Sequence, residues 1–130
     1  MAMIFPFIAT ANNTLIMSSE LGCPDDEVTI TASLANEADV VAAEIQIPLT
    51  EHTTYVDGSA TLNTQRINDH NINAAVVNDT LRIYIYSMSL SPIKGNGGEL
   101  MSFRLRLGKE PADYQHTHVC NNSAYRKLDV

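Results

Sequence analysis

Apolar and polar residues alternate along most of the chain, and this alternation predicts β-strands. In residues 40–50, VVAAEIQIPLT, alternate residues are apolar: Val41, Ala43, Ile45 and Ile47. The residues between them, Ala42, Glu44 and Gln46, point the other way because side chains change face with every residue of a strand. The stretch therefore predicts one strand with an apolar face and a face of small and polar groups, which Pro48 ends because it donates no ladder hydrogen bond.

The same period of two recurs in other segments, and no stretch of helical length carries a sustained apolar stripe of period 3.6. Strands are predicted within 13–20, 27–34, 52–63, 72–77, 80–88 and 99–108, with one or two more between 113 and 130. Each predicted strand has one apolar face. For residues 99–108 the inward set is Met101, Phe103, Leu105 and Leu107.

Turn residues separate these strands. Asn78-Asp79 joins two of them, and both residue types tolerate the positive φ of a two-residue hairpin. Asp57-Gly58 and the glycine-rich loop GNGG, residues 95–98, predict further turns.

About eight or nine short strands with one apolar face each predict an all-β fold, in which two sheets pack around a common core as a β-sandwich. The chain of 130 residues has no linker, internal repeat or low-complexity segment. We therefore predict that 1–130 is a single domain.

Composition narrows the classes of partner. The formal charge of −7 disfavours nucleic acid and anionic membrane surfaces, since both attract basic proteins. Because no apolar run approaches the roughly 20 residues that span a bilayer, no membrane-spanning segment is expected. The two cysteines, Cys23 and Cys120, are compatible with one disulfide or with two free thiols.

No catalytic motif stands out, so the chain is not expected to be an enzyme or to carry a cofactor. His116 and His118 have a spacing that suits one metal ion, but no third ligand lies nearby, and solvent-facing histidines are the favoured interpretation. The acidic run Asp25, Asp26 and Glu27 favours a solvated turn over a calcium site, because a calcium loop alternates its ligands around a glycine. The sequence therefore predicts no metal site.

The outward face of residues 80–88 carries the most distinctive candidate chemistry. Arg82, Tyr84 and Tyr86 alternate there with the apolar residues. Exposed aromatic residues on a sheet anchor protein partners or stack on sugar rings. If this strand lies beside residues 40–50, Glu44 and Gln46 join the same patch, and these five residues form the candidate partner-binding site.

The order of segments resembles the cohesin family, especially the cohesin-like domains of Bacteroidales surface proteins. The resemblance runs from about Asn13 to Tyr114 and is carried by residues 22–49, 55–62, 78–88 and 97–108. The matching motifs are Pro24-Asp25-Asp26, Ala43-Glu44-Ile45 and the run from Gly98 to Phe103.

This resemblance implies a jelly-roll sandwich on an exported or cell-surface bacterial protein, and docking of a dockerin-type module in place of catalysis. It also implies that Glu44 accepts hydrogen bonds from that partner, and that calcium in the complex belongs to the dockerin. The alternative is a carbohydrate-binding module on the same sandwich, with a polysaccharide as its ligand. The absence of Trp from the chain makes this the second choice.

Overall fold

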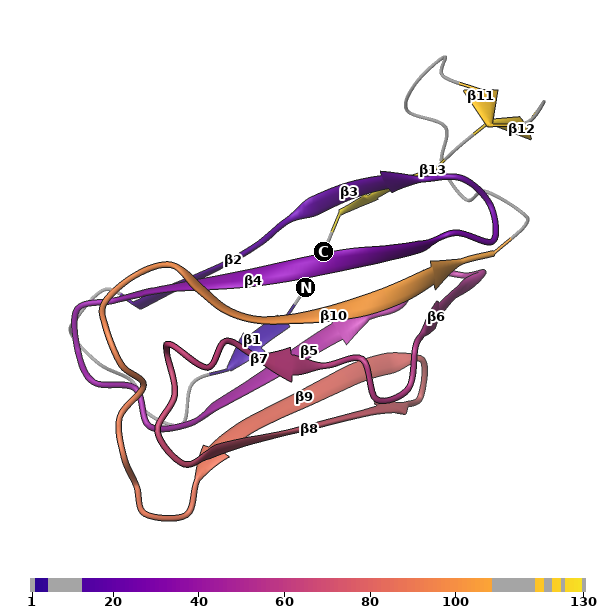
Figure 1. Ribbon diagram of the computed structural model, residues 1–130. Coiled ribbons are helices and arrows are strands. Elements are labelled where there is room, and N and C mark those ends of the chain that lie inside the picture. The colour runs from indigo at the N-terminus through magenta and orange to yellow at the C-terminus, as the bar shows by residue number, and fades with distance from the viewer. Residues whose placement is uncertain (1, 5–12, 109–118, 121–122, 125, 130) are drawn as a thin grey trace.

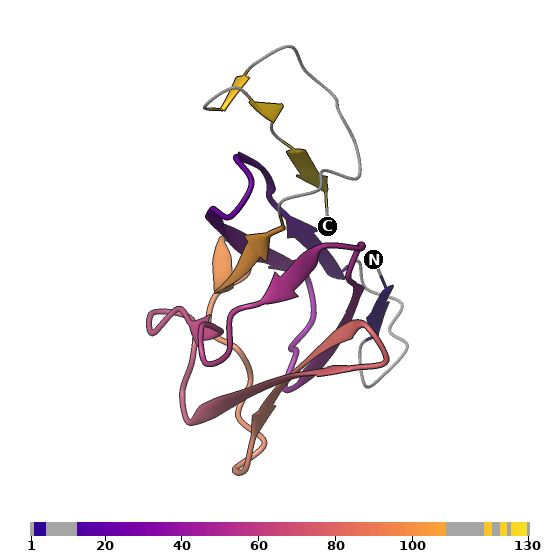
Figure 2. The ribbon, with the colours of Figure 1, turned by 90° about the vertical axis from the view of Figure 1, so that its right-hand side faces the viewer.

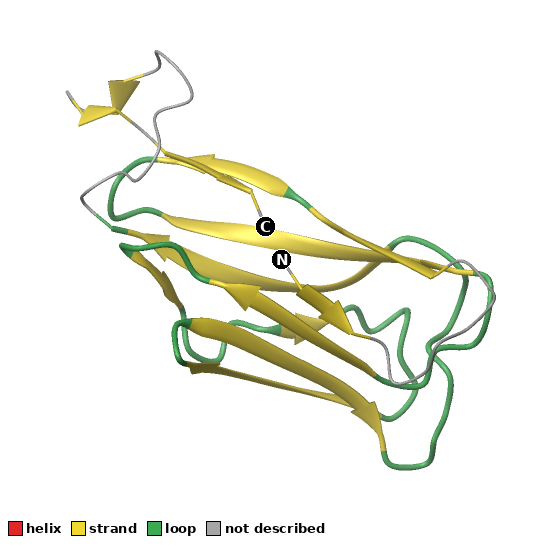
Figure 3. Ribbon diagram, turned by 180° about the vertical axis from the view of Figure 1, so that it is seen from behind, coloured by secondary structure: helices red, strands yellow, loops and turns green. Residues whose placement is uncertain are grey.

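A computed structural model describes residues 2–4, 13–108, 119–120, 123–124 and 126–129, with side chains for 13–108 except 19 and 21. All regular structure in these ranges is β, and Figure 3 shows strands and loops only. None of the described residues forms a helix of the length and apolarity that a membrane span needs. The prediction of an all-β fold is confirmed.

Two antiparallel sheets face each other (Figure 1). The four-stranded sheet has the order β1 (Ala2–Ile4), β5 (Ala43–Pro48), β9 (Thr80–Ser87) and β8 (His70–Val77). The five-stranded sheet has the order β2 (Asn13–Met17), β4 (Glu27–Asn36), β10 (Glu99–Leu107) and β6 (Thr53–Tyr55), with β7 (Thr61–Leu62) also paired to β10. Figure 2 shows the orange β10 in the upper layer and the salmon-coloured β8 and β9 in the lower layer. The predicted β-sandwich is therefore confirmed, while its jelly-roll connectivity stays a prediction.

Four short strands lie outside these two sheets. β3 (Ser19–Gly22) pairs with β13 (Arg126–Asp129), and β11 (Val119–Cys120) pairs with β12 (Ser123–Ala124). The one or two strands predicted between residues 113 and 130 are thus present in part, as β11, β12 and β13. His116 and His118 lie outside the described residues.

The core fills the space between the two sheets. Alternate residues of β4, β5, β9 and β10 supply it, and the largest fully buried side chains include Ile30, Leu34, Ile45, Ile83 and Phe103. Burying each such side chain stabilises the fold by roughly 1.5–3 kcal/mol. Because the apolar residues recur with a period of two, only one face of each strand gains this energy, and that face turns inward. The predicted inward set of β10 is confirmed. Leu100 is buried as well, because the register with β4 shifts between Glu99 and Met101.

Two predicted strands are shorter than expected because local hydrogen bonds replace the regular ladder. Residues 40–42 precede β5, and the carbonyl of Val40 accepts a hydrogen bond from Ile93 N in the loop before β10. The strand predicted within 13–20 breaks at Ser18, whose Oγ accepts from Thr31 N at 2.9 Å in place of a backbone carbonyl.

The hairpin between β8 and β9 is the one predicted. Asn78 and Asp79 have φ of 52° and 59°, and Val77 pairs with Thr80 directly before and after them. Positive φ at both turn residues is the type I′ geometry, whose twist matches that of the two strands.

Candidate functional site

Strand register brings the five candidate residues onto one face. β5 runs antiparallel to β9 with Glu44 opposite Tyr84 and Gln46 opposite Arg82. Their neighbours along each strand, such as Ile45 and Ile83, are fully buried, so the candidate side chains point away from the core. We call the outward side chains of β5, β9 and β8 the Glu44 face: Glu44, Gln46, Arg82, Tyr84, Tyr86, Asn71 and Asn73.

β8 extends this face on the side away from β5. Asn73 lies opposite Tyr84, and Asn71 lies opposite Tyr86. Asn73 Nδ2 donates to the Tyr86 hydroxyl at 3.4 Å, at the long end of hydrogen-bond geometry. The sequence pattern did not mark these asparagines, because only the pairing of β8 with β9 places them beside the tyrosines.

The charged groups of the Glu44 face do not pair with each other. Gln46 Nε2 donates to Glu44 Oε1 at 2.8 Å and so orients that carboxylate. The ion pairs among the described residues involve Glu51 and Glu27, and none includes Arg82. Arg82 Nε is buried without a hydrogen-bond partner. The face therefore offers one oriented carboxylate and one guanidinium that no described carboxylate neutralises.

Apolar surface adjoins this polar face. Tyr84 is 41% exposed, and Tyr86 is half-buried on the same side of β9. Met88 and Leu90, in the loop directly after β9, are 80% and 75% exposed. A partner on the Glu44 face would thus meet aromatic rings flanked by hydrogen-bonding groups, which is the composition of protein-docking surfaces.

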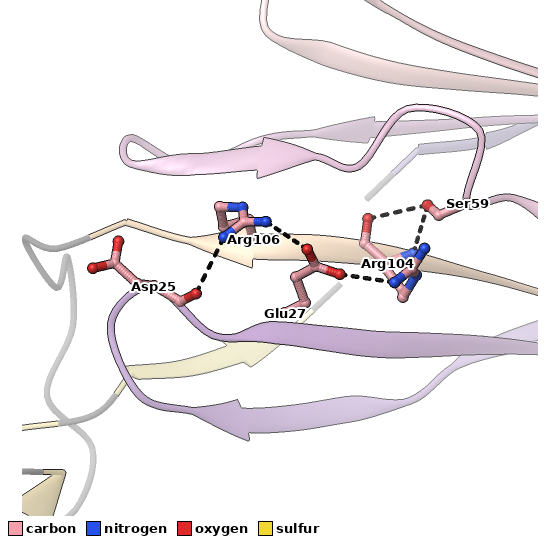
Figure 4. A network of polar contacts seen from close by, with 5 residues as sticks. All are labelled: Asp25, Glu27, Ser59, Arg104 and Arg106. Atoms are coloured by element: carbon pink, nitrogen blue, oxygen red, sulfur yellow. Dashed lines mark hydrogen bonds and ion pairs between the residues drawn. The ribbon is translucent and has the colours of Figure 1, made fainter.

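The outer face of the opposite sheet differs because its charged side chains pair with each other. Arg104 Nη1 and Arg106 Nη2 donate to the two carboxylate oxygens of Glu27 at 2.8 and 2.5 Å (Figure 4). Arg106 also donates to the backbone carbonyl of Asp25 at 3.4 Å. Both oxygens of Glu27 are therefore occupied by protein donors.

The acidic run at residues 25–27 builds a turn. Asp26 Oδ2 accepts from the backbone N–H of Cys23 at 3.0 Å, and Asp25 has a φ of 71°. Glu27 faces Arg104 and Arg106. No group of three or more His, Cys, Asp or Glu residues gathers at a metal-binding spacing within the described ranges. Within this turn, protein donors bond the carboxylates of Asp26 and Glu27.

Sequence reasoning missed a buried arginine. Arg66 is only 6% exposed, and its Nη1 donates to the carbonyls of Leu34, Gly97 and Gly98 at 3.1, 2.7 and 2.8 Å. Its Nε donates to Lys94 O at 2.5 Å. Burial lowers the pKa of Arg66. Because most of its acceptors are backbone carbonyls of the 94–98 loop and β4, Arg66 anchors the loop to the end of β4.

A second polar cluster lies at the C-terminal end of β9. Ser87 Oγ donates to Asp69 Oδ1 at 2.5 Å, and Ser89 N donates to Asp69 Oδ2 at 3.2 Å. These bonds from Ser87 and Ser89 lower the pKa of Asp69 to about 2. The neighbouring His70 accepts from Asn68 N through Nδ1 and is not hydrogen-bonded to the Ser87 hydroxyl. In this cluster the Ser87 hydroxyl donates to a carboxylate, while the His70 imidazole accepts from the backbone.

One cleft opens where the β8–β9 hairpin approaches β6. It has a volume of about 590 Å³, and Leu49, Tyr55 and Val76 supply its apolar wall. Thr54 and Asp79 lie at the same cleft. The Glu44 face contributes none of the residues that line it.

Cys23 is disulfide-bonded. The side chain of Cys120, the second cysteine of the sequence, lies outside the described residues. Of the two alternatives that the sequence left open, a disulfide or free thiols, Cys23 has the disulfide.

Comparisons with known proteins give no relative for this chain: no protein-family model matches it, and neither curated proteins nor solved structures yield a significant match.

Proposed function

We propose that this domain is a non-catalytic binding module of cohesin type, and that its Glu44 face docks a dockerin-type protein module. The observation that carries the proposal is the placement of Glu44, Gln46, Arg82 and Tyr84 as direct cross-strand neighbours on one outward face. The order of sequence segments that resembles cohesins supports it independently.

The chemistry of the face suits a protein partner. The carboxylate of Glu44 accepts hydrogen bonds from a partner, while Arg82 offers a cation to a partner carboxylate. Tyr84 supplies contact area at little cost in conformational entropy. The disulfide at Cys23 favours an exported or surface location, because disulfides persist in oxidising compartments.

Titration calorimetry against calcium-loaded dockerin modules from the same genome tests the proposal. We expect saturable binding that a calcium chelator abolishes. The double variant Glu44→Arg with Tyr84→Ala should remove it, since it reverses a charge and deletes a ring at the contact.

Glu99→Arg is the matched control, because Glu99 is an exposed residue of β10 in the opposite sheet and undergoes the same charge reversal. It should leave dockerin affinity unchanged. Equal binding by the double variant and the unmodified chain would show that the Glu44 face is not the interface.

A carbohydrate-binding module is the second candidate. Tyr84 and Tyr86 point outward from the same strand, and exposed aromatic rings stack on sugars. Affinity electrophoresis in polysaccharide gels tests the carbohydrate-binding hypothesis. Retardation that Tyr84→Ala abolishes, together with no response to any dockerin, would favour the carbohydrate over the protein partner.

A further inference from the structure

The strand β8 is a sheet edge that no second described strand pairs with. It ends the order β1-β5-β9-β8, and in Figures 1 and 3 it forms the lower margin of the sandwich. With eight residues it is longer than the other edge strands of the two main sheets, which have three residues in β1 and β6 and five in β2.

Edge strands normally carry a charge, a proline or a bulge that prevents pairing with another chain. β8 has the sequence HNINAAVV, which contains no Lys, Arg, Asp, Glu or Pro. Its pairing with β9 runs without a register shift from His70 to Val77. The edge is therefore long, regular and free of the usual protection.

The hairpin geometry identifies which backbone groups point outward from the sheet. Val77 and Thr80 flank a two-residue turn and form the hydrogen-bonded pair that closes it. Hydrogen-bonded and non-hydrogen-bonded pairs alternate along an antiparallel ladder. The N–H and C=O groups of Ile72, Ala74 and Val76 therefore face the open edge, where the described residues supply no partner for them.

We propose that β8 pairs antiparallel with β8 of a second copy of this chain, joining the two four-stranded sheets across a two-fold axis. A two-fold axis makes the contact self-complementary, and it leaves neither β8 edge free to recruit a third chain. The pairing resembles strand addition to a sheet edge, in which main-chain hydrogen bonds supply the affinity.

Charge selects the register. A two-fold axis at Ala74 would bring Asp69, just before β8, near the turn that holds Asp79 of the second copy, and like charges brought together oppose the pairing. An axis at Asn73 avoids this contact and retains an equal overlap of the strands. It sets Asn73 opposite its own copy and Ile72 opposite Ala74 of the second copy.

The same register covers apolar surface. Val76 faces the interior side of the sheet but is 44% exposed, because it lies at the mouth of the cleft. His70 of the second copy lies opposite Val76 in this arrangement. Because one pair of edge strands buries less than a standard interface, the dimer should dissociate on dilution.

Sedimentation equilibrium between about 1 µM and about 1 mM, the range in which small interfaces associate, tests the proposal on the full chain. We expect a monomer–dimer equilibrium. Asn73→Asp places two carboxylates opposite each other at the axis and should raise the dissociation constant by about two- to fivefold.

Asn71→Asp is the matched control, with the same chemistry on the same face, since Asn71 meets Ala75 of the second copy. It should change the dissociation constant much less. Ala74→Pro removes an N–H that faces the open edge and should abolish the dimer, while a thermal unfolding curve verifies that this variant folds. A monomer across the whole range, open-ended polymers, or equal effects of Asn73→Asp and Asn71→Asp would each overturn the two-fold pairing.

Discussion

Arg66 Nη2 donates a hydrogen bond to Oδ1 of Asn36 at 3.0 Å. Both residues are buried, and 30 positions of sequence separate them. Asn36 ends β4 and also donates through Nδ2 to the carbonyls of Ala38 and Gly95. The pair thus joins the end of a core strand to the glycine-rich loop before β10. Side-chain donors of the pair thus bond backbone carbonyls of this loop, including those of Gly95 and Gly97.

We predict that Arg66→Ala lowers the free energy of unfolding by about 3 kcal/mol, because Ala cannot replace the hydrogen bonds of this buried guanidinium to Leu34, the 94–98 loop and Asn36. Urea unfolding followed by circular dichroism measures the change. Arg104→Ala is the control, since Arg104 is a half-exposed partner of Glu27 and such surface pairs contribute about 1 kcal/mol or less. Equal losses in the two variants would contradict the anchoring role of Arg66.

The second prediction concerns how the stability of the fold changes at acidic pH. The pKa of Asp69 is lowered to about 2 by hydrogen bonds from Ser87 and Ser89, while an unfolded Asp titrates near 3.9. A lowered folded-state pKa contributes stability that is present above about pH 4 and is lost as the pH falls toward 2. Asp69→Asn should therefore lower the melting temperature at neutral pH, and this difference should shrink as the pH approaches 2.

Asp57→Asn provides the comparison for this pH series, because Asp57 is an exposed residue outside the Asp69 cluster. Differential scanning fluorimetry at several pH values gives both differences. A deficit of Asp69→Asn that stays constant down to pH 2 would rule out the proposed linkage.

The third prediction tests the β8–β9 turn. Asp79 adopts a φ of 59°, which glycine tolerates better than any residue with a Cβ. Asp79→Gly creates the preferred Asn-Gly turn and should stabilise the fold by about 0.5 kcal/mol. Asp79→Val should destabilise it by about 1–2 kcal/mol, because a β-branched residue resists this conformation. Thermal unfolding midpoints that do not separate the two variants would argue against the type I′ geometry.

The fourth prediction concerns Cys23. Removing a disulfide from a small domain costs about 2–4 kcal/mol. A reducing agent should therefore lower the melting temperature of the chain, and Cys23→Ser should lower it similarly. The reducing agent should have no further effect on Cys23→Ser. An identical melting curve with and without reductant in the unmodified chain would refute a stabilising role for the bond.

Much of the fold follows from local pattern. The inward sets of β4, β9 and β10 are the alternate apolar residues, because burial of one face leaves a strand only one favourable register. The Asn78-Asp79 turn was equally predictable, since it depends on the φ preference of two adjacent residues. That Arg82, Tyr84 and Tyr86 share the face opposite to this inward set follows from the same alternation.

Tertiary structure alone decided which strands became neighbours. The pairing of β5 with β9 sets Glu44 opposite Tyr84 across 40 residues of sequence, and no local preference specifies such a contact. The burial of Arg66 depends on carbonyls from β4 and from the 94–98 loop, which only the folded chain brings together. The strands and their faces could be predicted from local sequence, because those depend on adjacent residues. The sheet order, the buried arginine and the open edge of β8 arose from long-range packing, because they require segments distant in sequence to meet.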